Sequence, residues 1–110
     1  MRIKGITRED EAKLPRFGSH AEARAYFSAK YGEDAFQIED SFVVGEGDDA
    51  TIVYRYSLVL DRDAFEEGRR RLMQGSLQGE GAMRFLRSYQ TVEVSLEGSV
   101  SRDPLTRCRN

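Results

Sequence analysis

The sequence predicts an α+β fold, in which a small antiparallel sheet is packed on one face by helices. Two observations support this prediction. Segments whose apolar residues repeat with the helical period are followed by segments that alternate apolar and polar residues, and two alternating segments flank a turn rich in Gly and Asp. Each alternating segment has one polar side, as expected for a sheet with one face in water. The expected order is α-β-β-α-α-β, with three strands.

The chain is expected to begin with a short strand and a short helix. Residues 8–14 are predicted to be helical, because Thr7 and Asp10 have the spacing of an N-terminal capping pair and Pro15 ends the segment. Residues 1–6 are the candidate for a fourth, edge strand of the sheet. Such a strand would join the three that the alternating segments predict.

Residues 20–31 are predicted to form the best-defined helix. Ser19 and Glu22 fit the capping-box pattern S-x-x-E, and Gly32 stands where a helix commonly ends. Four apolar residues fall on one side of this helix: Ala23, Tyr26, Phe27 and Tyr31.

A β-hairpin follows this helix. Residues 36–44 and 52–61 both alternate, and the turn Gly45–Asp49 between them has the composition that closes hairpins. Strict alternation assigns one set of side chains to a single face of the first strand: Phe36, Ile38, Asp40, Phe42 and Val44. The opposite face would then carry Gln37, Glu39, Ser41 and Val43.

Two further helices are expected after the hairpin. Residues 64–74 follow the capping residue Asp63, and Gly68 in their middle costs about 1 kcal/mol of helix propensity, which close packing on the sheet would explain. Residues 75–81 hold three glycines and are predicted to be a loop. Residues 82–89 fit a short helix better than a strand, because a strand would place apolar residues on both faces.

The last predicted element is a strand over residues 92–100, in which Gly98 interrupts the apolar face and suggests a bulge. The tail 102–110 is expected to be mobile. Nothing in the composition divides the chain, so residues 1–110 are expected to form one domain, with 1–17 as its N-terminal segment.

Composition narrows the class of protein. The net charge of −2 gives no global basic field that would attract nucleic acid, and no apolar run is long enough to span a membrane. Cys108 is the only cysteine, so an internal disulfide is excluded and secretion has no support. The N-terminus lacks the apolar core of a signal peptide. We therefore expect a soluble protein of the cytoplasm.

No single residue carries a strong catalytic or metal-binding signal. His20 is expected to be a solvent-exposed residue at the start of its helix, and Cys108 lacks the fixed base that a catalytic thiol needs. Glu46, Asp48 and Asp49 cluster in the hairpin turn, but they do not follow the calcium-loop pattern. We expect no catalytic residue, no metal and no cofactor.

One cluster of basic residues is a candidate site for an anion or a partner. It consists of Arg69, Arg70, Arg71, Arg84 and Arg87. Arginine forks bind phosphates well, so nucleic acid is a candidate ligand. Against it, Glu66 and Glu67 lie four residues before Arg70 and Arg71, where they can neutralise them.

The sequence leaves three hypotheses for function. The preferred one is a non-enzymatic binding or interaction module that binds a protein partner or itself, because no catalytic motif is present and a three-stranded sheet has edges that a homodimer would cover. The second is a nucleic-acid accessory protein that uses the arginine cluster. The third is a small-molecule-binding or enzymatic domain with a pocket near the 75–81 loop.

Overall fold

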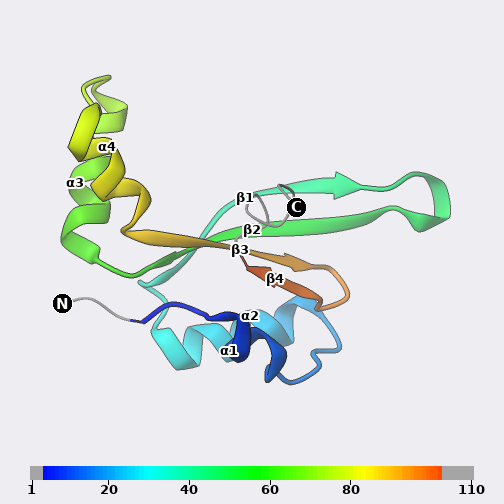
Figure 1. The fold of residues 1–110 in the computed structure, drawn as a ribbon. Coiled ribbons are helices and arrows are strands. Elements are labelled where there is room, and N and C mark those ends of the chain that lie inside the picture. Colours follow the sequence, from blue (N-terminus) through cyan, green and yellow to red (C-terminus); the bar gives the residue numbers. More distant parts are fainter. Residues whose placement is uncertain (1–3, 103–110) are drawn as a thin grey trace.

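The structure, a computed structural model, describes residues 4–102 and confirms the α+β class (Figure 1). The helices are α1 (Arg8–Ala12), α2 (His20–Tyr31), α3 (Arg62–Met73) and α4 (Gly79–Leu86), with a short 3-10 helix, η1 (Gly47–Asp49), in the hairpin turn. The strands are β1 (Phe36–Val44), β2 (Thr51–Val59), β3 (Tyr89–Ser95) and β4 (Val100–Arg102). They form one antiparallel sheet in the order β1-β2-β3-β4, so each strand pairs with its neighbour in sequence.

The fourth strand comes from the C-terminal part of the chain. The predicted strand 92–100 is in fact two strands, and Gly98 lies in the turn between them rather than in a bulge. Its φ of +97° suits glycine, and a Cβ there would lie 2.6 Å from the backbone oxygen of Phe17. Arg102, predicted to begin a mobile tail, ends β4 and pairs with Glu11 of α1 at 3.0 Å. The rest of that tail, with Cys108, lies outside the described residues.

The N-terminal segment is held by a side chain instead of by strand pairing. Residues 4–6 are not a strand, and residues 1–3 of that predicted strand lie outside the described part of the chain. The Gln90 amide oxygen accepts from the Ile6 N–H at 2.8 Å, and its NH₂ donates to the Ile6 carbonyl at 2.7 Å. The side chain of Gln90 thus satisfies the two backbone groups that a neighbouring strand would otherwise satisfy.

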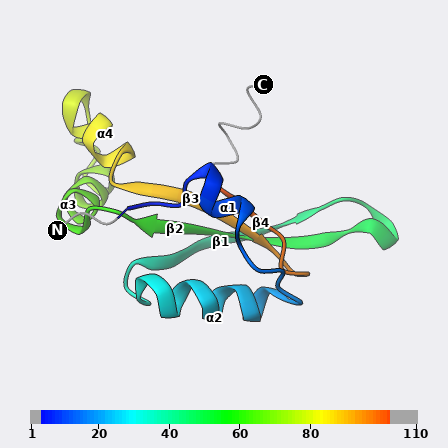
Figure 2. The same cartoon turned by 60° about the horizontal axis from the view of Figure 1, so that its bottom comes forward.

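The main core lies between α2 and one face of the sheet, which we call the helix face. Phe27 of α2 packs on Phe36 with ring centres 5.1 Å apart, and Phe36 stacks on Tyr56 at 4.2 Å. The other fully buried members are Ala23 of α2, Leu58 of β2, and Val92 and Val94 of β3. Helix α2 runs along this face in both views, and α1 lies near β4 (Figures 1 and 2). The predicted helix 20–31 is confirmed, with Ser19 as its cap.

A β-bulge in β1 changes which side chains face the core. Ile38 pairs with Tyr56, but the next paired residue is Asp40, opposite Arg55, so that Glu39 is the extra residue. After the bulge, Asp40, Phe42 and Val44 therefore lie on the opposite face from Phe36. We call this the open face. The strict alternation expected for β1 is wrong beyond Ile38, because one inserted residue exchanges the two faces.

Helices α3 and α4 form a hairpin at one end of the sheet (Figure 1). Helix α3 begins two residues before its predicted start, because Asp61 and not Asp63 caps it by accepting from the Ala64 N–H at 3.2 Å. Helix α4 begins at Gly79 inside the predicted loop and ends at Leu86, and Tyr89 opens β3. The prediction of a helix for this segment is confirmed with shifted ends.

No helix within residues 4–102 is long and apolar enough to cross a membrane.

We predict that Gln90→Leu destabilises the fold by about 2 kcal/mol or more, because the buried N–H and C=O of Ile6 both lose their partner. Gln90→Glu keeps the acceptor and loses the donor, so its loss of stability should be intermediate. Urea unfolding followed by circular dichroism measures both. A Gln90→Leu variant as stable as the parent would contradict this role.

Candidate functional site

The candidate site is an open groove between α3 and the open face of the sheet, with a volume of about 490 Å³. Its wall is apolar and comes mainly from the helix hairpin, with Phe65, Leu72 and Met73 on α3 and Phe85 on α4. On the sheet, its floor carries Ser57 of β2 and Thr91 of β3, which are Cα partners, together with Tyr89 of β3. Charged side chains form the rim along β1 and β2. An apolar wall with a few polar groups opposite it is the usual composition of a binding site.

Two side chains of the apolar wall are unusually exposed to solvent. Leu72 is 57% exposed and Met73 is 84% exposed, although both are large apolar side chains. They lie in the last turn of α3, where Arg69, Arg70 and Arg71 precede them. Exposed Met and Leu side chains that line a groove are typical of surfaces that bind another molecule, since their burial would release apolar area from water.

Close packing of α3 on α4 sets the position of this wall. Gly68 of α3 is buried, and a Cβ on it would lie 2.3 Å from Cδ1 of Phe85. Phe85 also packs on Phe65 and Tyr89, with ring centres 5.7 and 5.3 Å away. Gly68, which the sequence analysis expected to pack on the sheet, therefore packs against α4 instead. It lets the helices approach closely enough for this second, aromatic cluster to form.

Arg69 joins α3 to the bulge of β1. Its guanidinium donates to both carboxylate oxygens of Glu39, at 2.5 and 2.8 Å, and lies 4.6 Å from the centre of the Phe65 ring. A weaker bond at 3.5 Å reaches the amide oxygen of Gln37. Both bonds to Glu39 come from Nη2, and hydrogen bonds between two charged groups are shorter and stronger than neutral ones. This pair therefore orients the first rim of the groove.

Arg55 organises the second rim. It lies in the middle of β2, between Asp40 at 3.3 Å and Glu93 at 3.4 Å, and it covers the ring of Phe42 at 4.9 Å. The ion pairs of the two rims join three carboxylates to two guanidinium groups, and one of these carboxylates, Glu93, lies beside the groove and not in its lining. This ion-pair network has one surplus negative charge next to an apolar wall, an arrangement that suits a ligand with an apolar group next to a cation.

The structure separates the arginine cluster predicted from sequence. Arg69 points to the sheet, whereas Arg71 and Arg84 lie on another side of the helix hairpin and share Glu67, each at 3.2 Å. Arg84 and Arg87 line a further pocket with Met83, and Arg70 is exposed on α3. Arg69 therefore does not share a surface with Arg71 and Arg84, and each of these three has a carboxylate partner.

A small pocket does lie next to the loop that sequence singled out. It has a volume of about 220 Å³ and contains Gly81 and Glu80 of α4 opposite Glu67 and Arg71 of α3. The Arg71–Glu67–Arg84 ion pairs occupy its polar side. The larger groove on the open face does not include residues 75–81.

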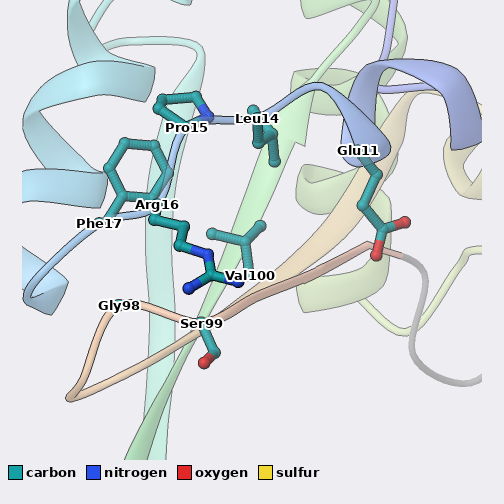
Figure 3. Close-up of a pocket in the computed structure, with 8 residues that line it drawn as sticks. All are labelled: Glu11, Leu14, Pro15, Arg16, Phe17, Gly98, Ser99 and Val100. Atoms are coloured by element: carbon teal, nitrogen blue, oxygen red, sulfur yellow. The ribbon is translucent and has the colours of Figure 1, made fainter.

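Another pocket, of about 470 Å³, lies between the N-terminal segment and the β3–β4 turn (Figure 3). In Figure 3 the Arg16 side chain extends across it toward Ser99 and Val100, and Pro15 and Phe17 border it. Glu11 on its far side pairs with Arg102 and so joins α1 to β4.

His20 differs from the exposed residue that the sequence predicts. It is half-buried, its Nε2 lies 2.6 Å from the hydroxyl of Tyr56, and its ring stacks on Tyr54 at 3.7 Å. Burial lowers the pKa of His20, with a further contribution from Arg24, and burial raises the pKa of Tyr56. A neutral imidazole can accept a hydrogen bond from the Tyr56 hydroxyl, so the contact connects α2 to the sheet.

The acidic turn of the hairpin does not gather its side chains into a metal site within the described residues. Among residues 4–102, no three His, Cys, Asp or Glu side chains converge closely enough to hold an ion. Glu46, Asp48 and Asp49 instead stand exposed around η1 at the tip of the hairpin.

No family model, no curated protein and no solved structure shows significant similarity to this chain. The geometry of its own residues is therefore the basis for the proposals below.

We predict that Gly68→Ala destabilises the protein by about 1–2 kcal/mol, although alanine favours a helix by about 1 kcal/mol, because the new methyl group overlaps the Phe85 ring. Gly81→Ala in α4 is the matched control. Nothing lies within 4 Å of its Cβ, so it should stabilise the protein. Thermal unfolding compares the two, and equal shifts in the same direction would contradict the packing described.

We predict that stability falls as pH decreases from about 7.5 to 5, through the ordinary His pKa of about 6.5 and toward the lower pKa of folded His20. The sign follows because the folded state binds the proton less well than the unfolded chain does. Stability is therefore complete above the unfolded pKa and is lost below it. His20→Gln should flatten this dependence in urea unfolding, and an unchanged slope would exclude His20 as its source.

Proposed function

We propose that this chain is a small, non-enzymatic protein-interaction module of the cytoplasm that self-associates and binds a protein partner in the groove between α3 and the open face. The observation that carries the proposal is the exposed apolar wall of Leu72 and Met73 facing a charged rim. Unpartnered apolar side chains beside a groove are accounted for if another molecule covers them.

The charges of the groove define the kind of partner. Arg55 is shared by Asp40 and Glu93, and Arg69 is matched by Glu39, so a carboxylate is in surplus. The favoured partner is a peptide segment with a large apolar side chain next to a Lys or Arg. The apolar side chain would pack on Leu72 and Met73, while the cation would approach the Asp40 rim.

The arginines of α3 and α4 support a nucleic-acid ligand less well than this partner. Phosphate binding needs several cations that act together and release counterions. Here Arg69, Arg71 and Arg84 already bind carboxylates, and Arg69 faces away from the other two.

The proposal predicts what a random peptide display library selects on the immobilised protein. Enriched peptides should carry an apolar residue adjacent to Lys or Arg. Leu72→Ser should lower the affinity for a selected peptide about tenfold or more, as measured by fluorescence polarisation, because it removes part of the apolar wall. Asp40→Asn should lower the affinity for the same peptide, because it removes the surplus negative charge.

Leu86→Ser is the matched control for this experiment. Leu86 is as exposed as Leu72, at 56% against 57%, but it does not line the groove. Its variant should bind the peptide like the parent. Failure to enrich such peptides, or equal loss in the Leu72 and Leu86 variants, would overturn the groove as the binding site.

A further inference from the structure

The pocket in Figure 3 is separate from the groove, since the two have no lining residue in common. Its walls come from two parts of the chain that are far apart in sequence. Residues 14–17 form one wall, and residues 98–100 of the β3–β4 turn and β4 form the other. The volume of about 470 Å³ lies in the range of sites that hold small molecules.

Contacts at both ends of this pocket fix the two walls relative to each other. At one end, Gly98 approaches Phe17 so closely that a Cβ on Gly98 would lie 2.6 Å from the Phe17 carbonyl oxygen. At the other end, Glu11 pairs with Arg102 at 3.0 Å. The pocket is therefore largely formed before a ligand binds, which reduces the ordering that binding requires.

Arg16 is the charged side chain of this pocket that has no ion-pair partner. Its guanidinium extends across the space between the two walls (Figure 3). Within residues 4–102, the ion pairs do not include Arg16, and the carboxylate of the lining, Glu11, binds Arg102. An arginine presents a rigid fork of donors whose geometry matches a carboxylate or a phosphate.

The other carboxylates next to the walls in sequence bind elsewhere. The Thr51 hydroxyl lies 2.8 and 2.7 Å from the two oxygens of Glu97, and Glu22 accepts from the Gly18 N–H at 2.6 Å. Because Arg102 neutralises Glu11, the pocket has one surplus positive charge. A single surplus cation beside a carboxylate suits a monoanion better than a dianion.

The edge strand β4 adds a neutral donor to this charge. The Ser95 N–H donates to the Ser99 carbonyl, so Ser99 faces β3 and the next residue, Val100, faces away from it. Since β4 is the last strand of the sheet, the Val100 N–H lies at the sheet edge, next to the pocket that Val100 lines.

We propose that this pocket binds a small monocarboxylate that carries an apolar group. The carboxylate would pair with Arg16 and accept from the Val100 N–H, and the apolar group would pack on Leu14, Pro15 and Phe17. This site goes beyond the proposed interaction with a protein partner and does not depend on it. The groove has surplus negative charge, so the two sites select ligands of opposite charge.

A titration of the isotope-labelled full chain with hydrocinnamate, followed by nuclear magnetic resonance, tests this site. The amide signals of Arg16, Ser99 and Val100 should shift together, with a Kd of about 5 mM or lower, as expected for a ligand of this size. Acetate lacks the apolar group and hydrocinnamamide lacks the charge. Each should therefore bind about tenfold more weakly than hydrocinnamate. Inorganic phosphate should also bind more weakly.

N-acetylphenylalanine distinguishes two sources of the same chemistry. It resembles the C-terminal residue of a peptide, whereas hydrocinnamate resembles a free acid. Tighter binding of N-acetylphenylalanine at the same amides would identify a peptide C-terminus as the ligand, and weaker binding would identify a free acid.

Arg16→Gln should lower the affinity for hydrocinnamate about tenfold, because it removes the charged donor. Arg8→Gln is the matched control, since Arg8 is also exposed and lies in the same N-terminal segment but does not line the pocket. Its variant should bind like the parent. Both side chains are exposed, so circular dichroism should show that both variants fold.

The acid site and the groove can fail separately. Leu72→Ser should bind hydrocinnamate like the parent, and Arg16→Gln should bind the peptides selected on the groove like the parent. The proposal would be overturned if hydrocinnamate does not bind, if its shifts fall in the groove, if phosphate binds more tightly, or if the Arg16 and Arg8 variants lose affinity equally.

Discussion

The β-bulge at Glu39 is the constraint on which the outer half of the molecule depends. Before it, β1 contributes Phe36 to the core between α2 and the sheet. After it, the side chains of β1 exchange faces, so that Asp40 and Phe42 meet Arg55 on the open face. The extra residue also places the Glu39 carboxylate where Arg69 of α3 binds it with both oxygens. One inserted residue thus connects the sheet, the helix hairpin and the rim of the groove.

The helix hairpin depends on a similarly local feature. Because Gly68 lacks a side chain, Phe85 packs directly against α3, and the rings of Phe65, Phe85 and Tyr89 form a cluster separate from the main core. This cluster holds α3 at the end of the sheet with Leu72 and Met73 exposed above the open face. The apolar wall and the charged rim of the groove are therefore positioned by different interactions, the first by packing and the second by ion pairs.

Much of the fold could be predicted from local sequence patterns. Helix α2 and the β1–β2 hairpin follow from capping residues, apolar periodicity and turn composition, which act over a few residues. The bulge could not be predicted, since Phe36–Val44 alternates regularly and the partner that stabilises it, Arg69, lies thirty residues away. The roles of Gln90 and His20 are equally hidden, because they depend on long-range hydrogen bonds, two between Gln90 and Ile6 and one between His20 and Tyr56. Of the predicted arginine cluster, only Arg69 lines the groove. Its position depends on the long-range ion pair with Glu39, which local sequence patterns do not reveal.

The most direct test of this account is the register of β1 against β2 in solution, measured from cross-strand nuclear Overhauser effects. With the bulge, Ser41 lies opposite Tyr54 and Phe42 lies opposite Val53. The corresponding backbone proton contacts, together with contacts of the Phe42 ring to Arg55, are the expected result. A regular strand would continue from the Ile38–Tyr56 pair and place Asp40 opposite Tyr54. Contacts between Asp40 and Tyr54 would contradict the bulge and, with it, the arrangement of the groove.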